Sequence, residues 1–230
     1  MAWNQLRCEN LPKSSWFRQL KDLHEKYRLP HPVETLQNKP TKNEWKSIVS
    51  KAIRNYWVPA IQADLTEKSS VYLLAKYDFT PGKAHRLWTD TNYDKRYIRR
   101  SCIKSKLLTG TYILQQNRAR FNQFAVDPTC LMCGDAPETI SHFLLHCKAL
   151  TEARNYYLEK SLHHFPEPLR GHYSRDDQLM VQIIMNCPDS ILWGNEIINT
   201  KQLASKTEPL SRGLCYALHC RRAALLCYRP

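Results

Sequence analysis

The sequence predicts a mainly α-helical protein, and three observations lead to this expectation. The 230 residues include six glycines against thirteen prolines, which suits helices separated by proline-marked loops better than an all-β fold with many turns. Apolar residues recur at helical spacing in several segments. Three cysteines and a histidine near the middle of the chain have the spacing of metal ligands. We therefore expect a multi-helix assembly with a small embedded CCHC zinc-binding unit.

Composition and charge narrow the class of protein. Hydrophobic residues make up 43% of the chain, which is enough for a core. The formal net charge of +13 attracts polyanions, of which nucleic acid is the commonest and an acidic membrane surface is the competitor. No uncharged apolar run approaches the roughly 18 residues needed to cross a bilayer, and the N-terminus lacks the apolar stretch of a signal peptide. We expect an intracellular protein, nuclear or cytoplasmic, that makes no use of a membrane.

Residues 1–90 are expected to form a helical N-terminal region. Residues 16–27 have apolar side chains at helical spacing, and the predicted buried face consists of Trp16, Leu20, Leu23 and Tyr27. A second helix begins at a capping box, Thr41-x-x-Glu44, and is expected to end before Pro59.

The remainder of this region has weaker signals. Residues 60–76 have a less regular helical pattern, and the Pro81-Gly82 turn is the expected joint with the rest of the chain.

Residues 91–165 are expected to form a basic helix pair followed by the zinc-binding unit. Two helices meet at a hinge, Thr109-Gly110, and six positive charges fall within the twelve residues 95–106. These cations could contact phosphates while Tyr112 or Phe121 stacks on bases, or they could form a solvated helical face beside core aromatics. The candidate nucleic-acid-binding residues are Lys95, Arg96, Arg99, Arg100, Lys104, Lys106, Arg118 and Arg120.

Residues 166–230 are expected to form a helical C-terminal region. The preceding helix ends at Pro166, and a polar loop follows. Residues 178–187 and 211–228 have the apolar pattern of two further helices, and the segment 187–196 between them is expected to be irregular.

The stretch CLMCGDAPETISHFLLHC, residues 130–147, contains the candidate metal ligands in the spacing Cys130-x2-Cys133-x8-His142-x4-Cys147. A lone C-x2-C pair is expected about 0.35 times by chance in a chain this rich in cysteine, but the whole quartet only about 0.002 times. Structural zinc takes four such ligands in a tetrahedron and leaves no position for water. The site is therefore expected to hold a fold, not to catalyse.

The local geometry of this stretch can also be predicted. Gly134 allows the backbone to turn back after the first ligand pair. A helix capped by Asp135, with Pro137 in its first turn, is expected to carry the second pair. Residues five apart in an α-helix point about 140° away from each other, so the helix must change geometry or end just before Cys147.

Two alternatives concern the other cysteines and histidines. His146 lies one turn from His142 and could replace it, although the spacing favours His142. The cluster could instead consist of unliganded core cysteines beside surface histidines. Nine cysteines is an odd number, which argues against a disulfide framework. Cysteines without a matching partner set are expected in the core: Cys8, Cys102, Cys187, Cys215, Cys220 and Cys227.

Residues 107–150 resemble the zinc-binding region that follows the reverse transcriptase domain in polyproteins of non-LTR (LINE-type) retrotransposons. The LLTG-x-Y hinge, the eight-residue spacing and the run ET-x-x-H-F-x-x-x-C all match. Residues 15–40 and 210–226 are similar to flanking segments in animal elements. Lys148 departs from the family, which often has proline there.

The resemblance implies that Cys130, Cys133, His142 and Cys147 bind structural Zn²⁺ and that the region grips RNA or DNA. We therefore expect a non-catalytic nucleic-acid-binding region. The alternative is a structural module that docks onto a reverse transcriptase domain supplied elsewhere.

An enzyme is the least favoured expectation because the metal-binding carboxylates of a polymerase are missing. Asp176-Asp177 is expected to be a solvated loop or a helix cap. A restriction-like endonuclease remnant could use Asp189 and Glu196, but no lysine follows at the required position.

Overall fold

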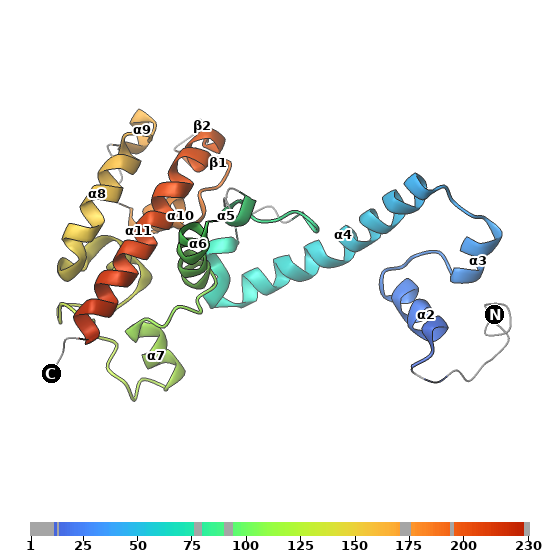
Figure 1. The fold of residues 1–230 in the computed structure, drawn as a ribbon, viewed down its shortest axis with the longest axis horizontal. Helices are drawn as coiled ribbons and strands as arrows, with labels where there is room; N and C mark the ends of the chain where they lie inside the picture. The colour runs from blue at the N-terminus through green and yellow to red at the C-terminus, as the bar shows by residue number, and fades with distance from the viewer. Residues whose placement is uncertain are drawn as a thin grey trace. The chain divides into compact units, whose positions relative to one another are not determined.

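The computed structural model describes residues 12, 14–75, 80–89, 94–170, 176–193 and 196–227, and it is mainly helical, as the sequence predicts. The chain divides into two compact units (Figure 1). Unit 1 comprises residues 1–67 and 78–83, and unit 2 comprises residues 68–77 and 84–230. The N-terminal segment with Cys8 and the polar loop over 171–175 lie outside the described residues.

The described part of unit 1 contains the helices α2 (Trp16–Lys26), α3 (Pro32–Gln37) and α4 (Lys42–Glu67). The predicted capping box starts α4, since Thr41 N donates to Glu44 Oε2 at 2.8 Å and Glu44 N donates to Thr41 Oγ1 at 3.3 Å.

The predicted end of this helix at Pro59 is wrong, because α4 continues to Glu67. Pro59 removes one backbone hydrogen bond. Half-buried Ile61 and buried Leu65 continue the helical spacing of Val58 beyond the proline, and their burial offsets that loss.

The predicted buried face of α2 is wrong for two of its four residues, while Leu20 and Tyr27 are half-buried. Trp16 is 64% exposed and Leu23 is 50% exposed, whereas Phe17 and His24 are buried. His24 is held inside because its Nδ1 donates to the Pro30 carbonyl and its ring stacks on Trp45. His24 has both a hydrogen-bond partner and a ring partner, so it can be buried although it is polar. It therefore occupies the inner face of α2 where the apolar spacing predicts Leu23.

Unit 2 is built around its last helix, α11 (Lys201–Cys227), which packs against three others, α6 (Lys95–Leu108), α8 (Thr151–Leu162) and α10 (Asp177–Asn186). In Figure 1 α11 runs in red between α8 and α6. The predicted regions 91–165 and 166–230 therefore share one core. The shorter helical elements are η1 (Ser69–Leu74), α5 (Arg86–Thr89), α7 (Gln115–Phe121), η2 (His142–His146), η3 (Lys148–Leu150) and α9 (Glu167–Arg170).

Residues 187–196, predicted to be irregular, instead contribute to a two-stranded antiparallel hairpin. Strand β1 (Ser190–Trp193) pairs with β2 (Glu196–Asn199), with Trp193 opposite Glu196. The sequence places Gly194-Asn195 between the paired residues, and this dipeptide is a hairpin signal that the prediction overlooked.

The core of unit 2 includes the candidate metal site. Phe143, Leu144 and Leu150 from the metal-site segment are fully buried together with Met185 and Leu214 of the surrounding helices. Within the described ranges, no helix combines the length and apolar character that crossing a membrane requires.

Candidate metal centre

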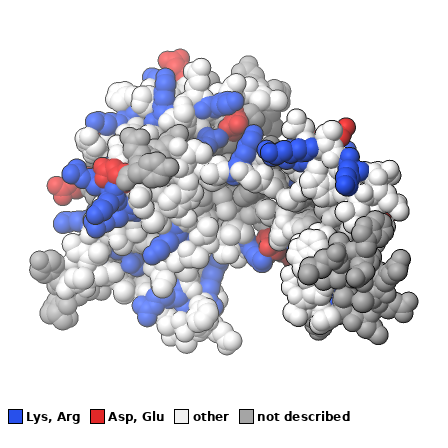
Figure 2. Space-filling view, turned by 45° about the vertical axis from the view of Figure 1, so that its right-hand side comes forward, with Lys and Arg blue, Asp and Glu red and all other residues white. Residues whose placement is uncertain are grey.

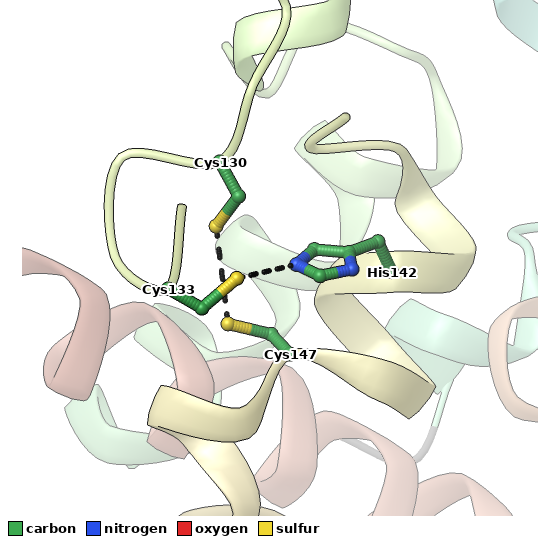
Figure 3. Close-up of side chains that lie close together, drawn as sticks. All are labelled: Cys130, Cys133, His142 and Cys147. Atoms are coloured by element: carbon green, nitrogen blue, oxygen red, sulfur yellow. Dashed lines mark hydrogen bonds between the residues drawn. The ribbon is translucent and has the colours of Figure 1, made fainter. Parts of the chain in front are cut away.

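The four predicted ligands converge on one point (Figure 3). Their ligand atoms all lie within 4.8 Å of one another, with Cys130 Sγ 3.8 Å from Cys147 Sγ and Cys133 Sγ 3.3 Å from His142 Nε2. Cys130 and Cys147 are fully buried and His142 is 7% exposed. This Cys₃His cluster could hold a metal ion.

The first ligand pair lies in a tight turn of irregular backbone. Gly134 has a φ of +72°, and its N–H donates to the Cys130 carbonyl at 2.8 Å, as the sequence predicts for a turn that needs glycine. Cys130 N donates to the Ala136 carbonyl at 2.8 Å, and Thr129 forms an antiparallel bridge with Pro137. These bonds fold the chain back on itself and hold both thiols toward the centre.

The second pair is separated by a widened helical turn. Residues His142–His146 form a π-helix, in which the Cys147 N–H donates to the His142 carbonyl five residues earlier at 2.7 Å. Cys147 then leaves the helix with a φ of −56° and a ψ of 116°. The predicted change of geometry before Cys147 is confirmed, and the wider turn lets residues five apart face the same centre.

The predicted cap of this helix is wrong. Thr139, not Asp135, accepts the hydrogen bond from the His142 N–H, at 3.1 Å. Pro137 is held in the bridge with Thr129, so the helix cannot start before it. Asp135 instead forms an ion pair with exposed Lys148 at 3.3 Å.

Burial shifts the pKa of Cys130, His142 and Cys147. It raises the pKa of Cys147 to about 12, an effect to which the neighbouring Cys130 adds, and it raises the pKa of Cys130 as well. Burial also lowers the pKa of His142, so the imidazole keeps a lone pair for a metal. Metal binding would release protons from the buried thiols.

Arg154 is a residue of the site that no local motif identifies. It is buried, and its guanidinium donates to the carbonyls of Leu144 and Cys147, both at 2.8 Å. These bonds satisfy carbonyls at the end of the π-helix, and they place a positive charge beside the thiols. Burial lowers the pKa of Arg154, and the negative charge of a Cys147 thiolate opposes this shift.

Glu138 connects the metal site to two helices. Its buried carboxylate accepts hydrogen bonds from the backbone N–H of Gln115, the first residue of α7, at 2.7 Å, and from Arg222 of α11 at 2.7 and 3.0 Å. The orientation of α7 therefore depends on the segment that carries the ligands.

His146 lies outside the cluster. Its Nε2 is hydrogen-bonded to the carboxylate of Asp177 at the surface. This position agrees with the preference for His142 as the ligand.

Most of the predicted phosphate-binding cations lie on the surface of α6 and α7, and Figure 2 shows Lys and Arg spread over one face of the molecule. Arg100 is half-buried. The exposed members are Lys95, Arg96, Arg99, Lys106, Arg118 and Arg120.

Two predicted contact residues must be withdrawn. Lys104 is 1% exposed and its Nζ lies 2.7 Å from Glu208 Oε2, because it occupies the side of α6 that packs on α11. Tyr112 is buried too, with its ring against Phe143 and its hydroxyl bonded to His219. Phe121, the other predicted stacking residue, is 88% exposed.

Two of the acidic residues considered as catalytic carboxylates, Asp176 and Asp189, have structural partners. Asp176 caps α10 through the Leu179 N–H, as predicted, and Asp189 pairs with Arg86. Glu196 lies in β2, and its side chain is outside the described set. Among the described side chains, the Cys₃His cluster is the sole group of three or more metal-ligating residues.

Fold and site together define a mainly helical protein with a buried Cys₃His cluster that could hold a metal ion. No family model matches the chain, and neither a curated protein nor a solved structure matches it.

Proposed function

We propose that the chain is a non-catalytic, zinc-stabilised region that binds RNA or DNA, of the type that follows a retrotransposon reverse transcriptase domain. The observation that carries this proposal is the connection from the cluster through Glu138 to the start of α7. Because α7 presents exposed cations and an exposed aromatic ring, a metal-held segment would orient a surface suited to nucleic acid.

The donor set suits zinc. Zn–S bonds of about 2.3 Å in a tetrahedron separate two sulfurs by about 3.8 Å, and the distance between Cys130 and Cys147 sulfurs is 3.8 Å. Bound zinc would supply a structural cross-link between the turn and the π-helix. A Zn²⁺ ion bound by three thiolates and a neutral histidine would have a net negative charge. The positive charge of Arg154 beside Cys147 offsets it.

The tip of α7 supports the nucleic-acid assignment. Phe121 is 88% exposed and Phe124 is 65% exposed, and they follow the exposed Arg120 by one and four positions. Gln123 and Phe124 have φ values of +52° and +61°, a strained pair that ends the helix and leaves both rings outward. Arg118 lies three positions before Phe121 on the same short helix as Arg120, so a phosphate contact and base stacking are available on one face of α7.

The test measures metal and nucleic acid separately. Elemental analysis is expected to give about one zinc per chain, lost in Cys130→Ser. Fluorescence anisotropy with labelled RNA and single-stranded DNA over a salt series is expected to show affinity that falls steeply with salt. Arg118→Glu with Arg120→Glu is expected to keep the zinc and lose most of the binding.

A matched control makes the same change in net charge at two positions outside α7. Lys201→Glu with Lys206→Glu alters two exposed positions on α11 and is expected to weaken binding much less. Equal losses in both double variants would show that only net charge matters, and a protein without zinc would remove the basis of the proposal.

A second candidate function is a structural module that docks onto a reverse transcriptase domain. The exposed apolar side chains of unit 1 favour it, because Trp16 and Leu23 on α2 and Ile48 on α4 are 64%, 50% and 38% exposed. If the protein does not bind nucleic acid, or binds it with an affinity that does not change with salt, the docking function is favoured instead.

A further inference from the structure

Unit 1 contains a groove that combines cations with aromatic rings. It lies between the C-terminal end of α2 and the middle of α4 and encloses about 550 Å³. Three cations, Lys26, Arg28 and Lys51, and two tyrosines, Tyr27 and Tyr56, are among its lining residues. Of the described residues that line it, none is acidic. We call it the aromatic-cationic groove.

The two tyrosine rings that line this groove form one cluster with Trp57, which lies beside Tyr56 but is not among the lining residues. The edge of one tyrosine ring faces the other, with centroids 5.2 Å apart for Tyr27 and Tyr56, and Trp57 Nε1 donates to the Tyr27 hydroxyl at 3.2 Å. The ammonium of Lys26 lies 5.4, 5.2 and 5.3 Å from the centroids of Tyr27, Tyr56 and Trp57. Tyr56 and Trp57 remain 40% and 39% exposed, so the cluster is open to a ligand.

We propose that the aromatic-cationic groove binds single-stranded nucleic acid, with a base against Tyr56 and Trp57 and phosphates against Lys26, Arg28 and Lys51. A lining with three cations and no carboxylate favours a polyanion. Open rings add a preference for unpaired bases, because a duplex keeps its bases stacked inside and offers mainly phosphates. The volume is within the range of sites that hold a small-molecule-sized group such as one nucleotide.

The residues of this groove belong to unit 1, whereas the α6–α7 surface and the metal cluster belong to unit 2. Lys26 has a role in both states of the groove. Without a ligand its ammonium rests against the three rings, and with one it pairs with a phosphate and frees the ring faces for a base.

The test uses the full chain and a labelled 12-nucleotide oligo(dT), with a duplex of the same length for comparison. Tyr56→Leu is expected to weaken single-strand binding about 10-fold and to change duplex binding much less, because only stacking is lost. Lys26→Gln with Arg28→Gln and Lys51→Gln is expected to reduce the salt slope by about two, since each single-strand phosphate contact contributes about 0.7. Quenching of Trp57 fluorescence by the oligonucleotide, identified with Trp57→Phe, is expected to report occupancy of the groove.

Two controls address folding and general charge. Tyr56→Phe keeps the ring and is expected to bind as the wild type does. Lys46→Gln with Arg54→Gln removes exposed charges from positions outside the lining of the groove, and Lys46, five residues before Lys51, points about 140° away from it. This control is expected to leave the Tyr56-dependent preference for the single strand intact.

The outcomes separate this proposal from the function proposed above. Trp57 quenching that survives Arg118→Glu with Arg120→Glu would support the groove even if the α7 surface proved irrelevant. Unchanged single-strand affinity in Tyr56→Leu, or equal loss for duplex and single strand, would overturn it. Binding of free dTMP with the same affinity as the oligonucleotide would also overturn it, by identifying a nucleotide site, and binding of an acidic peptide that matches the oligonucleotide would identify a protein-binding groove.

Discussion

The ammonium of Lys104 lies 2.7 Å from a carboxylate oxygen of Glu208, and both side chains are almost fully buried. Arg212, one turn after Glu208 on α11, is buried as well, and its Nε lies 3.7 Å from the other carboxylate oxygen. One carboxylate thus serves two buried cations where α6 packs on α11. Glu208 supplies the negative charge that both Lys104 and Arg212 need in order to be buried.

Glu208→Gln is expected to destabilise the protein by about 3–5 kcal/mol, because it leaves two buried cations without a counter-charge. Urea unfolding followed by circular dichroism measures the change. Adding Lys104→Met to this variant removes one of the unpaired charges and should recover part of the loss. Glu152→Gln on the exposed surface of α8 is the control and should change stability by less than about 0.5 kcal/mol. A cost for Glu208→Gln as small as that of the control would contradict the role assigned to the cluster.

Sequence spacing predicts the four ligands because they lie within eighteen residues and because zinc chemistry restricts their types. The change of helix geometry before Cys147 is predictable for the same local reason, since a five-residue spacing does not fit an α-helix. Thr139 as the actual cap was not predicted, because the bridge between Thr129 and Pro137 decides where the helix can begin.

Longer-range partners could not be predicted from local patterns. From its local sequence, Lys104 is indistinguishable from the exposed cations of a basic helix. It can be buried because Glu208, far along the chain, supplies a counter-charge in the core. His24 replaces Leu23 inside unit 1 for a similar reason, because Trp45 on another helix supplies its ring partner. Periodicity identifies a helix correctly in these cases but does not decide which of its faces meets a neighbour.

The choice between the two histidines gives a second prediction. His142→Ala is expected to lower bound zinc from about one per chain to a small fraction, whereas His146→Ala is expected to retain it, because only His142 faces the thiols. Elemental analysis after dialysis measures the stoichiometry. The absorption spectrum of the cobalt-substituted protein reports whether the remaining ligands keep a tetrahedral site. Loss of metal in His146→Ala with retention in His142→Ala would reverse the assignment.

Glu138 gives a third prediction, which concerns the link between the metal site and its neighbours. Glu138→Gln removes the charge that pairs with Arg222 and weakens the bond to the start of α7, so the free energy of unfolding should fall by about 3 kcal/mol. Asp135→Asn breaks the exposed pair with Lys148 and should cost less than about 0.5 kcal/mol.

The position of α7 supplies an independent readout for Glu138. Hydrogen exchange at the amide of Gln115 and its successors should accelerate in Glu138→Gln while zinc content stays unchanged. Unaltered exchange in α7 would mean that Glu138 stabilises the unit without orienting this helix.

The contact between Gly213 and Tyr157 gives the last prediction and tests how closely α11 approaches α8. A Cβ atom at Gly213 would collide with the Tyr157 ring. Alanine is ordinarily the better helix former by about 1 kcal/mol, so an isolated α11 would gain from Gly213→Ala. In the folded protein the clash should outweigh this gain and give a net loss of about 1–3 kcal/mol.

Replacing the ring should reverse the sign of the effect. In a Tyr157→Ala background the obstacle is gone, and Gly213→Ala should then be neutral or stabilise by up to about 1 kcal/mol. Urea unfolding of the four proteins in this double-mutant cycle measures both effects, and Gln202→Ala, at an exposed position of α11, controls for helix propensity alone. The same loss for Gly213→Ala in both backgrounds would place its cause in the backbone of α11, because a steric origin requires the ring of Tyr157 to be present.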